Sequence, residues 1–296
     1  MTMASSQPDS QSASDELGEP AVDWSYRLTQ LLFICSGLVC FTIFWYAGQM
    51  LGIPAEPRHG GSLLRQPTIG TTITGLVVAA VLLVGTTLLA GAFLRTRWFL
   101  AGLAAATAGL SAWSMRGGPM HEVTQYASSA GVFIWLAVEL VILAGIVAGL
   151  WVLLWQEPLE PAGTIPKASV VGAIITQTLC MGVIVLILAQ TDAKKQCVAA
   201  VFLGGLIASS LVESSFRAPA GGRWYWIAPL AVGLFGYLFA AFQNPGWADT
   251  PRILQGALAP LARPLPLDYA SAGMFGTLLG FWINSPGQEE GEGKPE

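Results

Sequence analysis

The chain has 296 residues, of which 53% are hydrophobic and only 11% are charged, and its mean hydropathy is +0.59. An ordinary soluble domain carries about 25% charged residues, so this composition excludes a water-exposed surface over most of the molecule. The net charge of -4 comes without any basic cluster, which excludes a nucleic-acid partner. The sequence therefore predicts an all-α integral membrane protein whose main partner is the lipid bilayer.

Residues 1–27 are rich in Ser, Gln and Pro and hold five acidic residues but no basic residue before Arg27. Such a segment cannot bury enough apolar surface to offset its ordering entropy, so we expect a disordered tail. It also lacks the basic start and apolar core of a signal peptide. Residues 285–296 have a similar composition. Both acidic tails are therefore candidates for binding protein partners.

Between the tails, long apolar runs separated by short polar breaks predict about eight transmembrane helices. A bilayer core of about 30 Å needs roughly 20 helical residues, so the third, sixth and eighth runs are short, and seven or nine spans stay open. The runs are continuous and do not alternate, which argues against a membrane β-barrel. They cover Leu28–Leu51, Ile69–Leu94, Trp98–Trp113, Ala130–Trp155, Ala168–Gln190, Cys197–Val212, Trp224–Phe242 and Tyr269–Ile283.

Two stretches of the chain are similar to each other, YASSAGVF from Tyr126 and YASAGMF from Tyr269, and each opens an apolar run. Other landmark residues keep a compatible order in the two halves. The sequence therefore predicts two tandem four-helix repeats, residues 28–155 and 156–284, with the same orientation because four crossings return the chain to its starting side. Chance similarity between apolar helices is the alternative interpretation.

Small residues spaced four apart indicate where membrane helices approach closely. Gly145 and Gly149 have this spacing in the fourth run, and Gly276 and Gly280 have it in the eighth. Because Gly lets two backbones come together, we expect close helix packing at both places.

The positions of the basic residues do not decide the orientation. With eight spans, the fourteen Lys and Arg residues divide evenly between the two sides of the membrane. We expect an integral protein of the plasma or inner membrane.

Glu139 is the strongest candidate for a functional residue. It lies about nine residues into the fourth run, where an ionised carboxylate is costly unless it is paired, hydrated or protonated. One interpretation is a substrate-binding or proton-coupling site formed by Glu139 and by Gln177 of the fifth run. The alternative is a structural role, in which a protonated Glu139 bonds to Gln177, Thr176 or Thr178.

Two histidines, His59 and His121, lie in loops predicted on the same side of the membrane, beside Glu56 and Glu122. A metal site from His59, His121 and Glu122 would be conceivable, but the sequence HEVTQ lacks the second His of a helical zinc motif. The four cysteines show no CxxC spacing. The sequence therefore predicts no metal site and no cofactor.

Two features at the ends of the predicted spans have simple interpretations. Glu213 has Arg217 four residues further on, which predicts a solvated ion pair on one helix. The apolar, Pro-rich segment Pro251–Asp268 is too interrupted to span the membrane. It predicts either an interfacial or re-entrant piece that covers one mouth of the bundle or an ordinary surface loop.

Three functions fit these features. A small-solute permease or channel is favoured by a two-repeat bundle with one deep carboxylate. A non-catalytic scaffold or sensor that acts through partners of the tails is the alternative. An intramembrane enzyme would need polar residues on one rim, and only Glu56, His59, His121 and Glu122 offer them. We expect the permease, and an enzyme is the least favoured.

Overall fold

The computed structural model describes residues 24–50, 62–64, 69–94, 99–125, 131–154, 167–216, 224–243 and 258–284. Within these ranges the chain is helical and contains no strand. Residues 1–23 and 285–296 of the two predicted tails, Tyr126 and His59 lie outside the described residues, so the structure does not test what the sequence predicts for them. The prediction of disorder is wrong for residues 24–27, which form the first turn of α1 (Trp24–Met50).

Helices occupy all eight of the segments predicted to be apolar spans. Five of these helices, α1, α2, α5, α6 and α7, are long and apolar enough to cross a membrane, which identifies a membrane protein. The bounds are α1 (Trp24–Met50), α2 (Ile69–Leu94), α3 (Phe99–Arg116), α5 (Gly131–Leu154), α6 (Lys167–Leu188), α7 (Lys194–Phe216), α8 (Ile227–Gln243) and α11 (Met274–Asn284).

The sixth helix is longer than the sequence predicts. Helix α7 has 23 residues and begins at Lys194, whereas the predicted run begins at Cys197 and ends at Val212. The prediction was wrong because polar residues at both ends of this helix were excluded from the apolar run. Lys194 and Glu213 are nevertheless helical, because both have partners inside the molecule.

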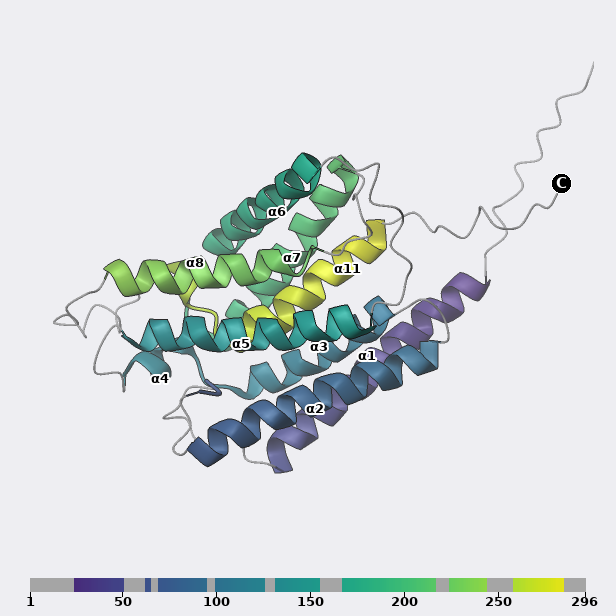
Figure 1. Ribbon diagram of the computed structural model, residues 1–296, viewed down its shortest axis with the longest axis horizontal. Helices are drawn as coiled ribbons and strands as arrows, with labels where there is room; N and C mark the ends of the chain where they lie inside the picture. The colour runs from purple at the N-terminus through teal and green to yellow at the C-terminus, as the bar shows by residue number, and fades with distance from the viewer. Residues whose placement is uncertain are drawn as a thin grey trace, which may run out of the picture.

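Helix α3 occupies the centre of the bundle. It packs against α1 and α2 on one side and against α7 and α11 on the other (Figure 1). Almost every residue from 101 to 114 is buried. Many of these residues are Ala, Gly or Ser, and Gly102 and Gly109 lie directly against the backbones of α2 and α1. Small side chains therefore let α1 and α2 approach the central helix closely.

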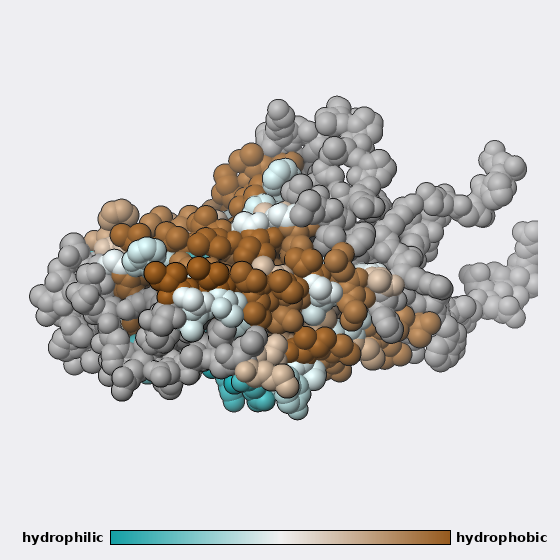
Figure 2. Space-filling view, turned by 60° about the horizontal axis from the view of Figure 1, so that its bottom comes forward, coloured by the Kyte–Doolittle hydropathy of each residue, from teal (hydrophilic) through white to brown (hydrophobic). Residues whose placement is uncertain are grey.

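The outer helices carry large apolar side chains on their exposed surfaces. Figure 2 shows a broad hydrophobic band across one face of the molecule. A soluble monomer rarely exposes so much contiguous apolar surface, and lipid is the solvent that such a surface fits. The exposed residues include Ile34, Leu38, Ile73, Val77, Val81, Ile134, Trp135, Val141, Ile175, Leu179, Val183, Phe235 and Phe239.

The glycine spacing predicts helix packing correctly in one of the two places. A Cβ atom built on Gly276 would lie 2.2 Å from the carbonyl oxygen of Phe202, and one on Gly280 would lie 2.4 Å from that of Leu206. Helix α11 therefore packs closely against α7. The prediction for α5 is wrong, because a Cβ atom at Gly145 or Gly149 would meet nothing within 4 Å.

The packing partners differ between the two predicted repeats. Helix α3 packs extensively against both α1 and α2, whereas α8, its counterpart in the second half, packs mainly against α5 and α6. Helix α11 packs against α7, whereas its counterpart α5 packs chiefly against α8. The tandem repeat therefore stays a prediction.

The segment before the last helix lies inside the bundle. Residues 261–268 are all buried, so the interpretation of this part as a surface loop is wrong. It contains a short 3-10 turn, η2 (Pro260–Ala262), and one turn of helix, α10 (Pro266–Asp268). A single π-helical turn, η3 (Tyr269–Gly273), joins α10 to α11, and such turns are frequent at functional sites.

Candidate functional site

Four connections between helices meet at one end of the bundle. They are the segment 62–64 between α1 and α2, helix α4 (Met120–Gln125) between α3 and α5, residues 189–193 between α6 and α7, and residues 258–268 before α11. Hydrogen bonds and ion pairs link these connections to one another and to buried polar residues of the helices. This end of the molecule therefore holds a concentration of charge that the rest of the bundle lacks among the described residues.

Glu139 lies on the inner face of α5 and is fully buried. Its carboxylate accepts a hydrogen bond of 2.6 Å from the Ser62 hydroxyl. It also accepts bonds from the backbone N–H groups of Leu63 and Leu64, at 3.1 and 3.2 Å. Three donors from one connection therefore surround this carboxylate, which satisfies the hydrogen-bonding need of a buried anion.

Asp268 is a second fully buried carboxylate at the same end. Its Oδ1 atom lies 2.6 Å from the Nζ atom of Lys194 and also accepts a hydrogen bond from the Ser114 hydroxyl. Its Oδ2 atom accepts a bond of 2.8 Å from the backbone N–H of Leu265. Asp268 is the third residue of the short helix α10, and its carboxylate bonds back to the backbone N–H that precedes the helix. Pro266 is the first residue of α10, a position that suits proline because its N–H would have no partner in the helix.

Lys194 forms an ion pair with Asp268 and lies close enough to Glu139 for their charges to interact. It is the first residue of α7, a position where a cation is normally disfavoured by the helix dipole, and its ion pair with Asp268 offsets that cost. The ammonium of Lys194 also interacts electrostatically with Glu139. We call Glu139, Lys194 and Asp268 the buried charge set. With all three ionised, this set carries a net charge of minus one in an apolar bundle.

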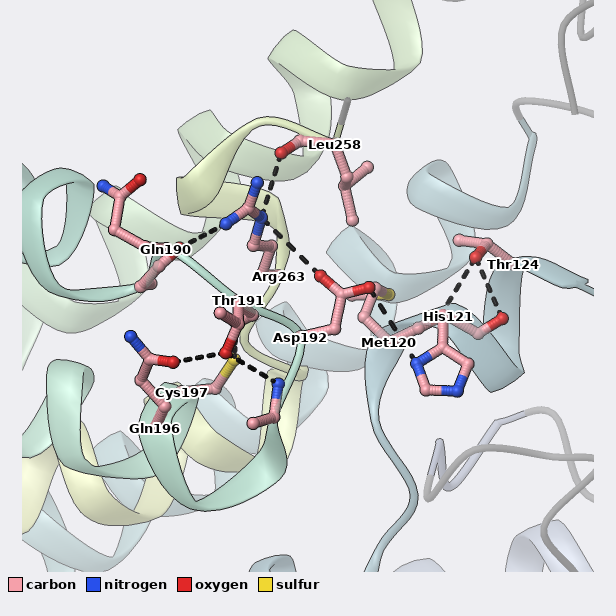
Figure 3. A network of polar contacts seen from close by, with 12 residues as sticks. Met120, His121, Thr124, Gln190, Thr191, Asp192, Gln196, Cys197, Leu258 and Arg263 are labelled. Carbon is pink, nitrogen blue, oxygen red and sulfur yellow. Dashed lines mark hydrogen bonds and ion pairs between the residues drawn. The ribbon is translucent and has the colours of Figure 1, made fainter. Parts of the chain in front are cut away.

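A second group of polar residues lies outside the buried charge set (Figure 3). One oxygen of Asp192 lies 3.6 Å from Nε of Arg263, and its other oxygen lies 3.9 Å from Nδ1 of His121. Arg263 also donates to the carbonyl oxygens of Ala189, at 2.9 Å, and Leu258, at 3.1 Å. The guanidinium therefore connects the α6–α7 connection to the segment before α11.

The expected pairing of Glu139 with Gln177 is not found. Gln177 is buried, but its amide donates a hydrogen bond of 3.2 Å to the carbonyl oxygen of Tyr225. Helix α8 explains the separation, because α5 and α6 both pack against it. The structure therefore places Gln177 and Glu139 in different polar groups.

Glu213 belongs to the group around Gln177. The expectation that it is a solvated residue is wrong, because Glu213 is buried and accepts a hydrogen bond of 2.7 Å from the hydroxyl of Tyr225. Arg217, its expected partner, lies outside the described residues. Tyr225 lies in the turn before α8, where burial and the neighbouring Glu213 raise the pKa of its phenol. The phenol therefore stays protonated and keeps donating to Glu213.

Sequence reasoning missed Lys194, Asp268, Asp192 and Arg263. Each lies in a connection or at a helix end, where charge is ordinary and gives no sign of burial. The available signal was the segment Pro251–Asp268, in which isolated charges interrupt an otherwise apolar and Pro-rich stretch. An apolar connection with few charges is typical of a segment that lies inside the protein, where each charge needs a partner.

The described residues contain no group of three His, Cys, Asp or Glu side chains able to hold a metal ion. His121 instead faces Asp192, while Glu56 and His59 lie outside the described residues. The four cysteines are free thiols in the structure.

Comparison with known proteins finds no family model, no curated protein and no solved structure that matches this chain. The residues and their geometry therefore carry the functional argument.

Proposed function

We propose that this protein is a permease for a small solute, in which the buried charge set couples transport to the movement of a proton. The observation that carries the proposal is the pair of fully buried carboxylates, Glu139 and Asp268, at one end of the bundle, with Lys194 paired to Asp268. Ionisable residues within a membrane bundle are costly and typically lie on ion or proton pathways. A net charge of minus one would favour uptake of one proton.

The buried charge set offers two positions for a proton. The Ser62 hydroxyl and Glu139 are 2.6 Å apart, so a protonated Glu139 would donate to Ser62 where the ionised form accepts from it. Lys194 and Asp268, at 2.6 Å, form a second pair between which a proton could move. Both pairs between which a proton could move therefore lie at one end of the bundle.

The proposal includes the topology. We infer that all eight helices cross the membrane and that both tails lie on the same side. The meeting of the first, third, fifth and seventh connections at one end of the bundle supports an even number of crossings. The buried charge set would then lie near the membrane surface opposite the tails.

A scaffold or sensor without transport is the second candidate. It is favoured by the hydrogen bonds of Glu139, because all three come from residues 62–64. In this role Glu139 would anchor one connection and would never exchange a proton. The acidic tails would then bind the partners.

The two candidates differ in what Glu139→Gln does. The purified protein is heated with a panel of amino acids, sugars, organic cations and nucleosides, and a solute at 100 times its dissociation constant should add about 2.7 kcal/mol of stability. Each stabilising solute is then added to proteoliposomes that contain a pH-sensitive dye. We expect proton entry with wild type and none above the protein-free rate with Glu139→Gln.

Glu213→Gln is the matched control, because it removes a buried carboxylate from the other polar group and should leave proton entry unchanged. If no solute stabilises the protein, and the mixed panel drives no more proton entry in wild type than in Glu139→Gln, the permease proposal is wrong and the scaffold is favoured.

A further inference from the structure

Residues 258–268 form a largely buried segment that contributes Asp268 to the buried charge set, and we call this segment the strap. Two kinds of contact hold it. On one side, the hydroxyl of Tyr237 donates to the carbonyl of Pro264 at 2.6 Å, and that of Tyr269 donates to the carbonyl of Leu261 at 2.8 Å. These bonds tie the strap to α8 and to the start of the last helix.

On the other side, the strap is tied to the connection 189–193 through charge. Arg263 donates to the carbonyl of Ala189 at 2.9 Å and pairs with Asp192 at 3.6 Å. Asp268 pairs with Lys194 just beyond this connection. Arg263 is 7% exposed and Asp192 is 21% exposed, so the pair is accessible at its outer edge.

The composition of the strap suits a segment that moves as a unit. Pro260, Pro264 and Pro266 have no backbone N–H group, so fewer backbone hydrogen bonds must break when the strap leaves its position. Asp192 also has a second cation nearby, because its other oxygen faces His121 at 3.9 Å. When Arg263 moves away, Asp192 therefore keeps His121 as a neighbour.

We propose that the strap is a gate over the buried charge set and that Arg263, bound to Asp192 and Ala189, is its latch. The structure holds the closed form, in which Glu139 and Asp268 are fully buried. Opening would expose the set to water on the side of the α6–α7 connection. This gate rests on the proposed function for what passes through it, but its opening can be measured without any solute.

Cys197 is a native reporter for this opening. Its side chain is 1% exposed, its thiol lies 3.4 Å from the carbonyl of Thr191, and it sits among the charges of the latch and the set. Cys40 is the matched control, because it is equally buried but lies where α1 packs against Gly109 of α3. Movement of the strap should expose Cys197 and leave Cys40 buried.

The experiment uses two full-length proteins, each keeping one of these cysteines while the other three are replaced by Ala. A cationic methanethiosulfonate reagent is added to the detergent-purified proteins, and the labelling rates are compared with and without Arg263→Met or Asp192→Asn. We expect either substitution to accelerate labelling of Cys197 by about tenfold or more, because it raises the population of a locally open state. The rate at Cys40 should stay the same.

Chemical activation does not explain such a result for Arg263→Met, because losing a nearby cation makes the reactive thiolate less favourable. The gate is refuted if neither substitution raises the labelling rate of Cys197. It is also refuted if the labelling rate of Cys40 rises equally, since this would report a general loosening of the bundle. Faster labelling without transport in proteoliposomes would support the gate and remove the permease. Transport in proteoliposomes with unchanged labelling would support the permease and refute the gate.

Discussion

At the scale of single residues, the ion pair between Lys194 and Asp268 is a point of fragility. Taking two charges out of water costs several kcal/mol per ion, and the attraction between them repays this only with good geometry and further hydrogen bonds. Asp268 has both, since Ser114 and the backbone of Leu265 donate to it as well. The pair therefore stabilises the fold only while both partners are present.

We expect Lys194→Met or Asp268→Asn alone to lower the free energy of unfolding by about 3–5 kcal/mol, because a single substitution leaves an unpaired buried charge or an unmatched donor. The double variant should lose much less than the sum. The measurement is unfolding in mixed detergent micelles, arranged as a double-mutant cycle.

Lys195→Met is the control for this cycle, because Lys195 is exposed next to Lys194 and should change stability little. Additive effects of the two single substitutions would contradict a coupled pair.

Only part of this site could be predicted from the sequence. Glu139 stands out because an acid in the middle of an apolar run is rare, and the structure places it in the main polar group. Gln177 does not join it, because the order of helices along the chain does not reveal that α8 lies between α5 and α6. Asp268 and Lys194 come together from positions 74 residues apart, which no local pattern records.

At the scale of elements, the helices were predictable and their contacts were not. Continuous apolar runs between polar breaks define helices well, because lipid requires every backbone group to be bonded within its own segment. The same runs give little information on packing, since these helices are apolar on all sides. Gly276 and Gly280 predicted contact correctly because α7 faces them, whereas Gly145 and Gly149 have the same spacing and face no neighbour.

This difference gives a matched pair of substitutions. Gly280→Ala should lower the free energy of unfolding by about 1–3 kcal/mol, because the added methyl group would lie 2.4 Å from the carbonyl of Leu206 and the helices would have to separate. Gly145→Ala should be neutral or stabilise by up to about 1 kcal/mol, because Ala favours a helix more than Gly does.

Unfolding of the two variants in the same detergent provides the comparison. Equal effects at Gly280 and Gly145 would mean that α11 and α7 do not approach as closely as described.

At the scale of the whole molecule, the convergence of alternate connections on one end suggests how the chain lies in the membrane. Residues 62–64, α4, residues 189–193 and the strap follow α1, α3, α6 and α8 respectively. In an alternating bundle these four connections share one side. The N-terminal end of α1, at Trp24, and the C-terminal end of α11, at Asn284, then lie on the other side.

Accessibility of engineered cysteines tests this topology. In a cysteine-free background, Ser5→Cys and Ser285→Cys should react with a membrane-impermeant thiol reagent from the same side of sealed vesicles, because the proposed eight crossings would bring the chain back. Thr191→Cys, in an exposed position of the α6–α7 connection, should react only from the opposite side. Labelling of positions 5 and 285 from different sides would require an odd number of crossings.

The central position of α3 has a consequence for how the protein is made. This helix is rich in Ala, Gly and Ser and is not among the five described helices that are long and apolar enough to cross a membrane. A segment of weak hydropathy partitions poorly into lipid from the translocation machinery when it is alone. In the proposed eight-span topology, we therefore expect α3 to enter together with α1 and α2, its neighbours in sequence and in space. We expect a substitution that delays the pairing of α1 with α2 to impair the insertion of α3 during synthesis, even where the finished protein would tolerate the change.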